Sequence, residues 1–161
     1  MALHRLVRAC PPLDPNSSYC NLLQCSHFKT TSIAAVSDGD LVGSVTGYLI
    51  PDRPDTLFIW QVAVHPVVRG KGLARMMLRK LLERMAVQGI RFIETSVTPN
   101  NEASLKLFAG FAAEQHADMV RSVMFEQSIH FHGEHDTELL LRIGPLDASA
   151  RSLSNEQGET P

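Results

Sequence analysis

The spacing of apolar residues changes several times along the middle of the chain. Residues 57–64, LFIWQVAV, form an almost unbroken apolar run, which is typical of a strand buried on both faces. From residue 73 to residue 88 the apolar positions recur at helical spacing, and Gly89 follows where a helix C-cap is expected. Residues 90–97, IRFIETSV, again indicate a strand. This order predicts two parallel strands joined by a right-handed helical crossover.

Further elements flank this unit on both sides. Pro11, Pro12 and Pro15 exclude a regular helix up to Asn16, and Asn16 or Ser17 can cap the helix that follows. The other predicted elements are a hairpin of strands 31–36 and 41–50, a loop at 51–56, a short helix that begins within 98–101 and runs to about Phe108, and strands at 119–125 and 138–144. The pattern predicts an α/β (α+β) fold, in which helices flank a mixed central sheet of six or seven strands.

The composition limits the domain organisation and the class of function. We expect one domain at residues 1–145, followed by a polar and disordered tail at 146–161. The net charge is −2 with no block of like charge, so neither a nucleic-acid groove nor a membrane surface is indicated. No apolar run approaches the roughly 18 residues of a membrane span. The three cysteines lack disulfide or metal spacing, and we expect a cytoplasmic protein with reduced thiols.

The most informative segment is VAVHPVVRGKGLARMM, residues 62–77, where a buried strand leads through a glycine turn into a helix. The free N–H groups and partial positive charge of a helix N-terminus favour an anion such as pyrophosphate. Gly70 and Gly72 allow close approach of the backbone, and Arg69 and Lys71 add positive charge. The segment therefore predicts a phosphate-binding turn.

Several phosphate-binding patterns compete for this turn. The G-x-x-x-x-G-K-[ST] pattern of a P-loop is not present. A dinucleotide-binding turn fits Gly70 and Gly72, with Glu94 as a partial match to its ribose-binding acid, but Arg75 occupies the third glycine position. A plain glycine turn before an amphipathic helix is the structural alternative.

Two motifs resemble those of the GNAT acetyltransferase superfamily. The acyl-CoA-binding pattern [QR]-x-x-G-x-[GA] is matched by Arg69, Gly72 and Ala74, and the pattern N-x-x-[AS]-x-x-L-[YF] by Asn101, Ser104, Leu107 and Phe108. The resemblance implies a GNAT fold in which strands 57–64 and 90–97 splay apart around the pantetheine arm of acetyl-CoA. It implies that the coenzyme is held by Val62, Ala63, Val64, Arg69, Gly70, Lys71, Gly72, Leu73, Ala74, Asn101 and Ser104.

One position departs from the superfamily pattern. Many GNAT enzymes carry a tyrosine at the position of Phe108, where it protonates the leaving thiolate. A phenylalanine cannot do so, but a thiolate with a pKa of about 8.5 is a tolerable leaving group near neutral pH. The resemblance therefore leaves open a non-catalytic CoA-binding module beside an enzyme.

Segments outside the coenzyme motif resemble a narrower family, the diaminobutyrate acetyltransferases of ectoine synthesis. These segments are PPLDPNSSYCNLLQCSHF, GYLIPDRPDTLFIWQVAVHP and IHFHGEHDTELLLRIGP. The resemblance implies direct acetyl transfer from acetyl-CoA to the γ-amino group of diaminobutyrate, in a homodimer that supports the response to osmotic stress. A GNAT enzyme for another primary amine, such as a polyamine or a peptide N-terminus, is the alternative.

A diamine substrate needs acids for its ammonium groups and an acceptor for the proton of the attacking amine. Asp14 is a candidate anchor or simply a turn residue, and Trp60 either contacts a cation or packs in the core. Glu94 is the candidate catalytic base on the opposite strand, or a strand residue facing solvent. Thr95 and Ser96 are weaker candidates for that role.

The segment HFHGEHD, residues 130–136, crowds histidines and acids together and suggests a metal site. Its spacing completes no known ligand set, and GNAT chemistry needs no metal, so we expect none. The segment is either a solvated loop or a loop that closes over the substrate. In the second interpretation Glu134 binds an amine, with His132 or Glu138 as further candidates.

Overall fold

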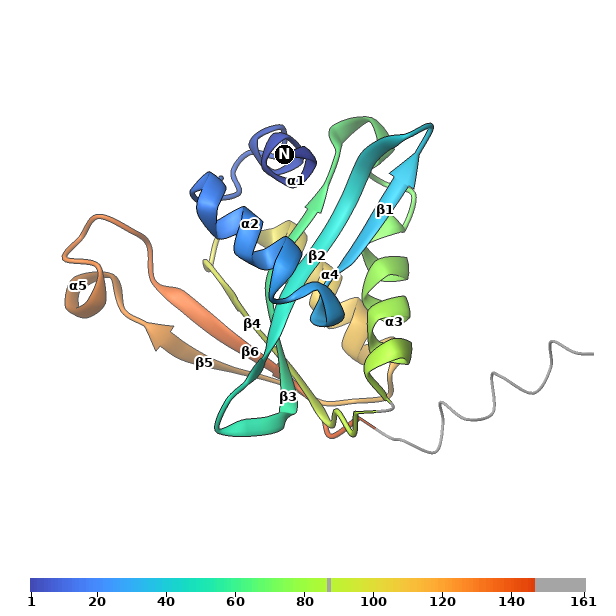
Figure 1. The fold of residues 1–161 in the computed structure, drawn as a ribbon. Coiled ribbons are helices and arrows are strands. Elements are labelled where there is room, and N and C mark those ends of the chain that lie inside the picture. Colours follow the sequence, from blue (N-terminus) through green and yellow to red (C-terminus); the bar gives the residue numbers. More distant parts are fainter. Residues whose placement is uncertain (87, 147–161) are drawn as a thin grey trace, which may run out of the picture.

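The structure, a computed structural model, describes residues 1–86 and 88–146, which form a six-stranded sheet with flanking helices (Figure 1). The strand order is β1-β2-β3-β4-β6-β5; β3 and β4 are parallel and the other neighbours are antiparallel. The strands are β1 Ile33–Ser37, β2 Asp40–Ile50, β3 Arg53–Val64, β4 Phe92–Val97, β5 Met119–Phe125 and β6 Glu138–Ile143. The helices are α1 Ala2–Arg8, α2 Ser18–Ser26, α3 Leu73–Ala86, α4 Glu102–Glu114 and α5 Gln127–His130, with 3-10 helices η1 Lys29–Thr31 and η2 Pro66–Val68. The predicted mixed sheet is confirmed.

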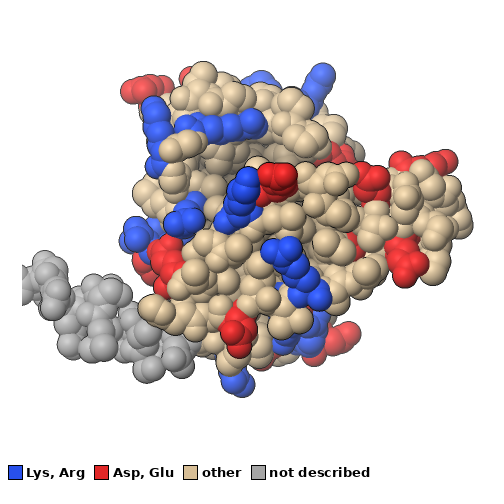
Figure 2. Space-filling model, turned by 180° about the vertical axis from the view of Figure 1, so that it is seen from behind, with Lys and Arg blue, Asp and Glu red and all other residues tan. Residues whose placement is uncertain are grey.

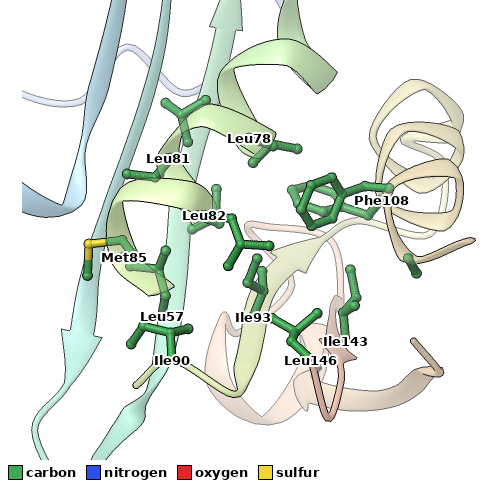
Figure 3. Close-up of a cluster of buried hydrophobic side chains, with 14 of the residues drawn as sticks. Leu57, Leu78, Leu81, Leu82, Met85, Ile90, Ile93, Phe108, Ile143 and Leu146 are labelled. Atoms are coloured by element: carbon green, nitrogen blue, oxygen red, sulfur yellow. The ribbon is translucent and has the colours of Figure 1, made fainter. Parts of the chain in front are cut away.

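Most of the hydrophobic core lies between the sheet and helices α3 and α4. Helix α3 buries one apolar stripe, formed by Met77, Leu78, Leu81, Leu82 and Met85. Figure 3 shows its leucines packed with Leu57 of β3, Ile93 of β4 and Phe108 of α4. Leu146, which was predicted to belong to the tail, is only 4% exposed and belongs to this core. The rest of the predicted tail, residues 147–161, lies outside the described residues.

A second, smaller core lies under the N-terminal helix. Leu3, Leu6, Val7 and Cys10 of the α1 segment pack against Ala63 near the end of β3. The expectation of no regular helix before Asn16 is therefore wrong, because the prolines begin only after α1 has ended at Arg8. The spacing of the four apolar residues is helical, so the sequence does carry the signal for this helix.

The N-cap predicted at Asn16 or Ser17 is found at Ser17, α4 begins with an asparagine cap, and several element boundaries move. The Ser17 side chain accepts a hydrogen bond from the Cys20 N–H at the start of α2, and Asn101 accepts one from the Ser104 N–H at the start of α4. The predicted loop at 51–56 is wrong: the pairing of Ile50 with Arg53 leaves only a two-residue turn, and Pro54 lies near the beginning of β3. The three additional short helices η1, η2 and α5 were not predicted, and α4 extends past Phe108 to Glu114.

Charged side chains of both signs are scattered over the face seen in Figure 2. The segment that joins β5 to β6 projects from the body of the molecule together with the adjoining ends of both strands; we call residues 122–138 the arm (Figure 1). The arm contains four acids and no Lys or Arg. None of the described helices combines the length and apolar character that a membrane crossing requires.

Candidate active site

The central feature of the site is an opening between β3 and β4. These strands pair only from Thr56 with Phe92 to Ile59 with Thr95. Beyond this point β3 continues to Val64 paired with β2 on its other side, while β4 ends at Val97 paired with β6. The two strands therefore separate, as the resemblance implied, and one backbone edge of β3 faces the opening.

A β-bulge at Trp60 changes the direction of the β3 side chains at the point where the opening begins. Thr46 of β2 pairs with Gln61 and Gly47 pairs with Ile59, so Trp60 is the extra residue. Its indole packs edge-on against Tyr48, with ring centroids 6.1 Å apart, and remains 41% exposed. Tyr48 in turn contacts Phe58 at 5.3 Å. The bulge thus helps to form an aromatic wall with one exposed indole ring.

A large cavity of about 1200 Å³ lies between the aromatic wall and the arm. Five segments line it: the lead-in at 12–16, the aromatic wall, the end of β4 at 96–98, the N-terminus of α4 and part of the arm. Asp14, Trp60 and Glu134, which are far apart in the sequence, all line this cavity. His132 does not line it, whereas His135 does.

The large cavity carries negative charge. Its described lining residues include five carboxylates, from Asp14, Glu102, Glu134, Asp136 and Glu138, and no Lys or Arg. His135 lies on the same wall, with Nε2 3.9 Å from Glu138 Oε1 and Nδ1 2.8 Å from the Asp136 carbonyl oxygen. Among the described residues no group of three or more His, Cys, Asp or Glu is placed to hold a metal ion. The arrangement suits organic cations.

Asp14 has a turn role and also faces the cavity. Its Oδ1 accepts a hydrogen bond of 2.9 Å from the Asn16 N–H, while its carbonyl oxygen accepts one of 2.8 Å from the Gln61 side chain. The second bond ties the lead-in segment to β3 beside the bulge. The two interpretations of Asp14 from the sequence are therefore compatible.

The glycine turn encloses a smaller cavity of about 230 Å³ at the N-terminus of α3. Its lining residues are Val64, Val68, Arg69, Gly70, Gly72, Leu73, Ala74, Arg75 and Leu107. Gly70 and Gly72 both have φ of +75°, a conformation that favours glycine. The Arg69 Nε donates a hydrogen bond of 2.9 Å to the Val64 carbonyl oxygen, which fixes the turn to the end of β3.

The remaining predicted coenzyme contacts lie in different places. Val62 and Ala63 belong to the part of β3 that follows the bulge, and Ala63 packs in the small core under α1. Lys71 lines a separate apolar groove between β1 and α3 instead of the small cavity. Asn101 lines the large cavity while capping α4 through the N–H of Ser104.

Glu94, the expected catalytic base, is 1% exposed and lies on β4 where β3 and β4 still pair. Arg53 donates two hydrogen bonds to its carboxylate, at 2.5 and 2.9 Å, and Arg142 donates another. Burial alone raises the pKa of Glu94, but these hydrogen bonds and charges outweigh it and hold the pKa below its ordinary value. Glu94 is also absent from the lining of the large cavity. This placement argues against the expected catalytic role.

Several residues of the site were not singled out from the sequence. Tyr48 and Phe58 complete the aromatic wall, Asn16 and Phe125 line the large cavity, and Arg75 lines the small one. The first four come from separate segments of the chain and meet only in the folded protein, so no local sequence signal marks them as one site. Arg75 did have one, because it follows the acyl-CoA motif directly on α3.

Comparison with known proteins agrees with this geometry. A sequence model of the acetyltransferase (GNAT) family matches residues 2–111. The solved structure of the diaminobutyrate acetyltransferase of Paenibacillus lautus, in complex with L-2,4-diaminobutyric acid and coenzyme A, superimposes with a TM-score of 0.84 at 39% identity, covering 89% of this chain and 87% of that one. Fold, opening and turn thus define a GNAT acetyltransferase.

Two curated relatives narrow the family further. The L-2,4-diaminobutyric acid acetyltransferase of Methylotuvimicrobium alcaliphilum is 53% identical over 91% of this chain and 85% of its own length. The enzyme of the same name from Vibrio cholerae is 48% identical over 92% of this chain and 86% of its own length. The chain belongs to the L-2,4-diaminobutyric acid acetyltransferase family within the GNAT acetyltransferases.

Proposed function

We propose that this protein transfers the acetyl group of acetyl-CoA to the γ-amino group of L-2,4-diaminobutyrate, a step of ectoine synthesis. The observation that carries the proposal is that the lining of the large cavity has five carboxylates and no Lys or Arg, at the place where β3 and β4 diverge. A substrate with two ammonium groups is attracted to such a cavity. Asn16, Ser96, Asn100 and Gln127 on the same lining supply hydrogen-bond donors for its single carboxylate.

In the proposed reaction the γ-amine attacks the thioester carbon directly in a ternary complex. The γ-ammonium first gives up one proton, and the neutral amine then forms the N–C bond as the C–S bond breaks. The nitrogen loses its second proton after the attack, and the CoA thiolate gains one. Val62, Ala63 and Val64 offer backbone groups to pantetheine and an N–H to the developing oxyanion. The N–H groups of residues 69–74 hold the pyrophosphate. Asn101 and Ser104 contact the coenzyme at the start of α4.

The residues of the large cavity have separate parts in this proposal. Glu134 and Asp14 bind the ammonium groups, and the exposed indole of Trp60 contacts a cation through its ring face. One of the cavity carboxylates accepts the proton from the attacking amine, directly or through water. Phe108 is 2% exposed within the core, so the thiolate leaves without a tyrosine.

A substrate panel tests the activity. The protein is mixed with acetyl-CoA and diaminobutyrate, ornithine, lysine, a polyamine or a peptide, and release of the CoA thiol is followed. Diaminobutyrate should give the highest kcat/KM. Equal rates with all amines would refute the specific substrate, and binding of acetyl-CoA without turnover would favour a non-catalytic module.

A pair of glutamine substitutions tests the site. Glu134→Gln should raise the KM for diaminobutyrate about 10- to 100-fold, because a charge-assisted hydrogen bond contributes roughly 1.5–3 kcal/mol. The KM for acetyl-CoA should stay within about twofold. Glu126→Gln is the matched control, since Glu126 belongs to the same arm but does not line the cavity. Equal kinetics in the two variants would remove Glu134 from the site.

We also propose that the protein is a cytoplasmic homodimer that serves the osmotic stress response. Strand β5 is at one edge of the sheet, and the segment from β5 to α5 exposes Val120, Val123, Phe125 and Ile129. An open edge strand with apolar side chains is suited to pairing with a second copy. The three cysteines are free thiols, as the cytoplasm requires. Light scattering should give twice the 17.8 kDa chain mass, and a mass of one chain would refute the dimer.

A further inference from the structure

Arg75 stands apart from the other cations of the glycine turn. It is the third residue of α3 and lines the small cavity at the helix N-terminus. Arg69 also lines this cavity, but its Nε is committed to the Val64 carbonyl oxygen. Lys71 lines the groove on the other side of the turn. Arg75 is therefore the cation of the turn that reaches the small cavity from the helix itself.

The position of the Arg75 guanidinium depends on Gly110 of α4. A methyl group at Gly110 would overlap the Arg75 Nη2 atom and would lie 3.1 Å from Cζ. The guanidinium therefore lies directly on the backbone of α4, in a place that only a glycine leaves open. Gly110 thus leaves room for the guanidinium beside α4, within reach of Glu114.

The ion pair between Arg75 and Glu114 is a loose one. Its Nε is 3.9 Å from Glu114 Oε2, which is beyond hydrogen-bond distance, and its side chain is 50% exposed. Arg79, one turn further along α3, lies 4.0 Å from the same carboxylate. Glu114 therefore keeps a partner when Arg75 moves, and the cost of releasing Arg75 is small.

We propose that Arg75 is a further coenzyme-binding residue, which leaves Glu114 and donates hydrogen bonds to a phosphate of CoA. This inference rests on the proposed function, since it assumes that CoA occupies the small cavity. A guanidinium matches a phosphate with two parallel N–H donors, which an ammonium cannot reproduce. The ligand group is either the diphosphate at the turn or the 3′-phosphate of the adenosine.

The test compares two arginines that share a partner and an exposure but differ in their place at the cavity. Arg75→Ala should weaken CoA binding, measured by titration calorimetry, about 10- to 100-fold. Arg79→Ala should stay within about twofold of the wild type, because Arg79 is equally exposed and pairs with Glu114 but does not line the cavity. Arg75→Lys should recover only part of the affinity, since lysine keeps the positive charge but lacks the two parallel N–H donors of the guanidinium.

Gly110→Ala is an independent test that leaves the arginine in place. Alanine has a higher helix propensity than glycine, so the substitution should not lower the melting temperature by destabilising α4. The added methyl displaces only the flexible end of Arg75 from the position beside Glu114 that this arginine leaves on binding, so the CoA affinity of Gly110→Ala should stay close to that of the wild type. A loss of CoA affinity in Gly110→Ala as large as in Arg75→Ala would contradict the release of Arg75 from this position, and equal affinities in the two arginine variants would overturn the inference.

Titration with 3′-dephospho-CoA distinguishes the two phosphate groups. If the Arg75→Ala loss vanishes with this analogue, the arginine binds the 3′-phosphate; if the loss persists, it binds the diphosphate, and both results support the inference. A wild-type protein that does not bind CoA would instead refute the proposed function. Normal wild-type binding with no difference between Arg75→Ala and Arg79→Ala would refute the role of Arg75 alone.

Discussion

Replacement of Glu94 by glutamine separates a structural role from a catalytic one. The carboxylate is buried and accepts hydrogen bonds from Arg53 and Arg142, each a bond to a charged group worth roughly 1.5–3 kcal/mol in a buried setting. The two arginine side chains are 46% and 32% exposed, so water replaces part of what is lost. Glutamine also keeps one acceptor oxygen. We expect Glu94→Gln to lower the free energy of unfolding by about 2–4 kcal/mol.

Thermal and chemical unfolding followed by circular dichroism measures this loss. For a chain of this size the expected fall in the melting temperature is roughly 4–16 °C. The turnover number of the folded variant, measured well below its transition, should change by less than about threefold. Glu83→Gln is the control, because Glu83 makes only exposed ion pairs on α3 and should cost at most about 0.5 kcal/mol.

The pH dependence of the same variant follows from the lowered pKa of Glu94. A carboxylate whose pKa is lower in the folded state stabilises the protein fully above the unfolded value of about 4.5. That contribution is lost as the pH falls through the folded pKa. The difference in stability between wild type and Glu94→Gln should therefore be constant above about pH 5 and close in more acid solution. Unchanged stability together with a turnover number reduced by two orders of magnitude or more would refute this reasoning and restore Glu94 as the base.

Two further substitutions test the elements that frame the site. Ser17→Ala removes the cap of α2 and should lower the free energy of unfolding by about 1 kcal/mol. Ser18→Ala, one position inside the helix, should lower it by less, and equal losses in the two variants would contradict the capping role of Ser17. Gly47→Ala places a methyl group 2.5 Å from the Phe58 carbonyl oxygen and should lower the free energy of unfolding by about 3 kcal/mol. The methyl group of Gly43→Ala meets only the flexible ends of the Met77 and Leu73 side chains, so the loss in the same assay should be clearly smaller.

The elements with strong periodicity could be predicted from the sequence. Helix α3 and the strands around it follow from apolar spacing within a short window, and the caps at Ser17 and Asn101 follow from local hydrogen-bond chemistry. The start of β3 could not be predicted, because Pro54 suggests a loop unless the tight pairing of Ile50 with Arg53 is known. That pairing is a property of two strands together.

Some residues of the candidate site could likewise be predicted from the sequence, and others could not. The glycine turn is contiguous in sequence, so its motif reveals most of its members. The large cavity is assembled from five separate segments, and residue type alone does not show which histidine of the arm faces it. His135 lines the cavity and His132 does not, although they are three positions apart. His132 has φ of 51° and is followed by Gly133 at 87°, and this turn decides the direction of the later residues.

Glu94 shows how a residue chosen for its chemistry can lie apart from the cavity in the folded protein. An acid on the strand opposite the coenzyme is a reasonable base, but Glu94 lies where β3 and β4 still pair, two residues before Ser96 at the cavity. There it joins Arg53 of β3 to Arg142 of β6, and Arg142 also stacks on the Phe92 ring at 3.8 Å. Three strands are thus held together immediately below the point at which β3 and β4 diverge. The hydrogen bonds of Glu94 with Arg53 and Arg142 hold the strands together at one end of the opening. The bulge at Trp60 lies where β3 begins to separate from β4.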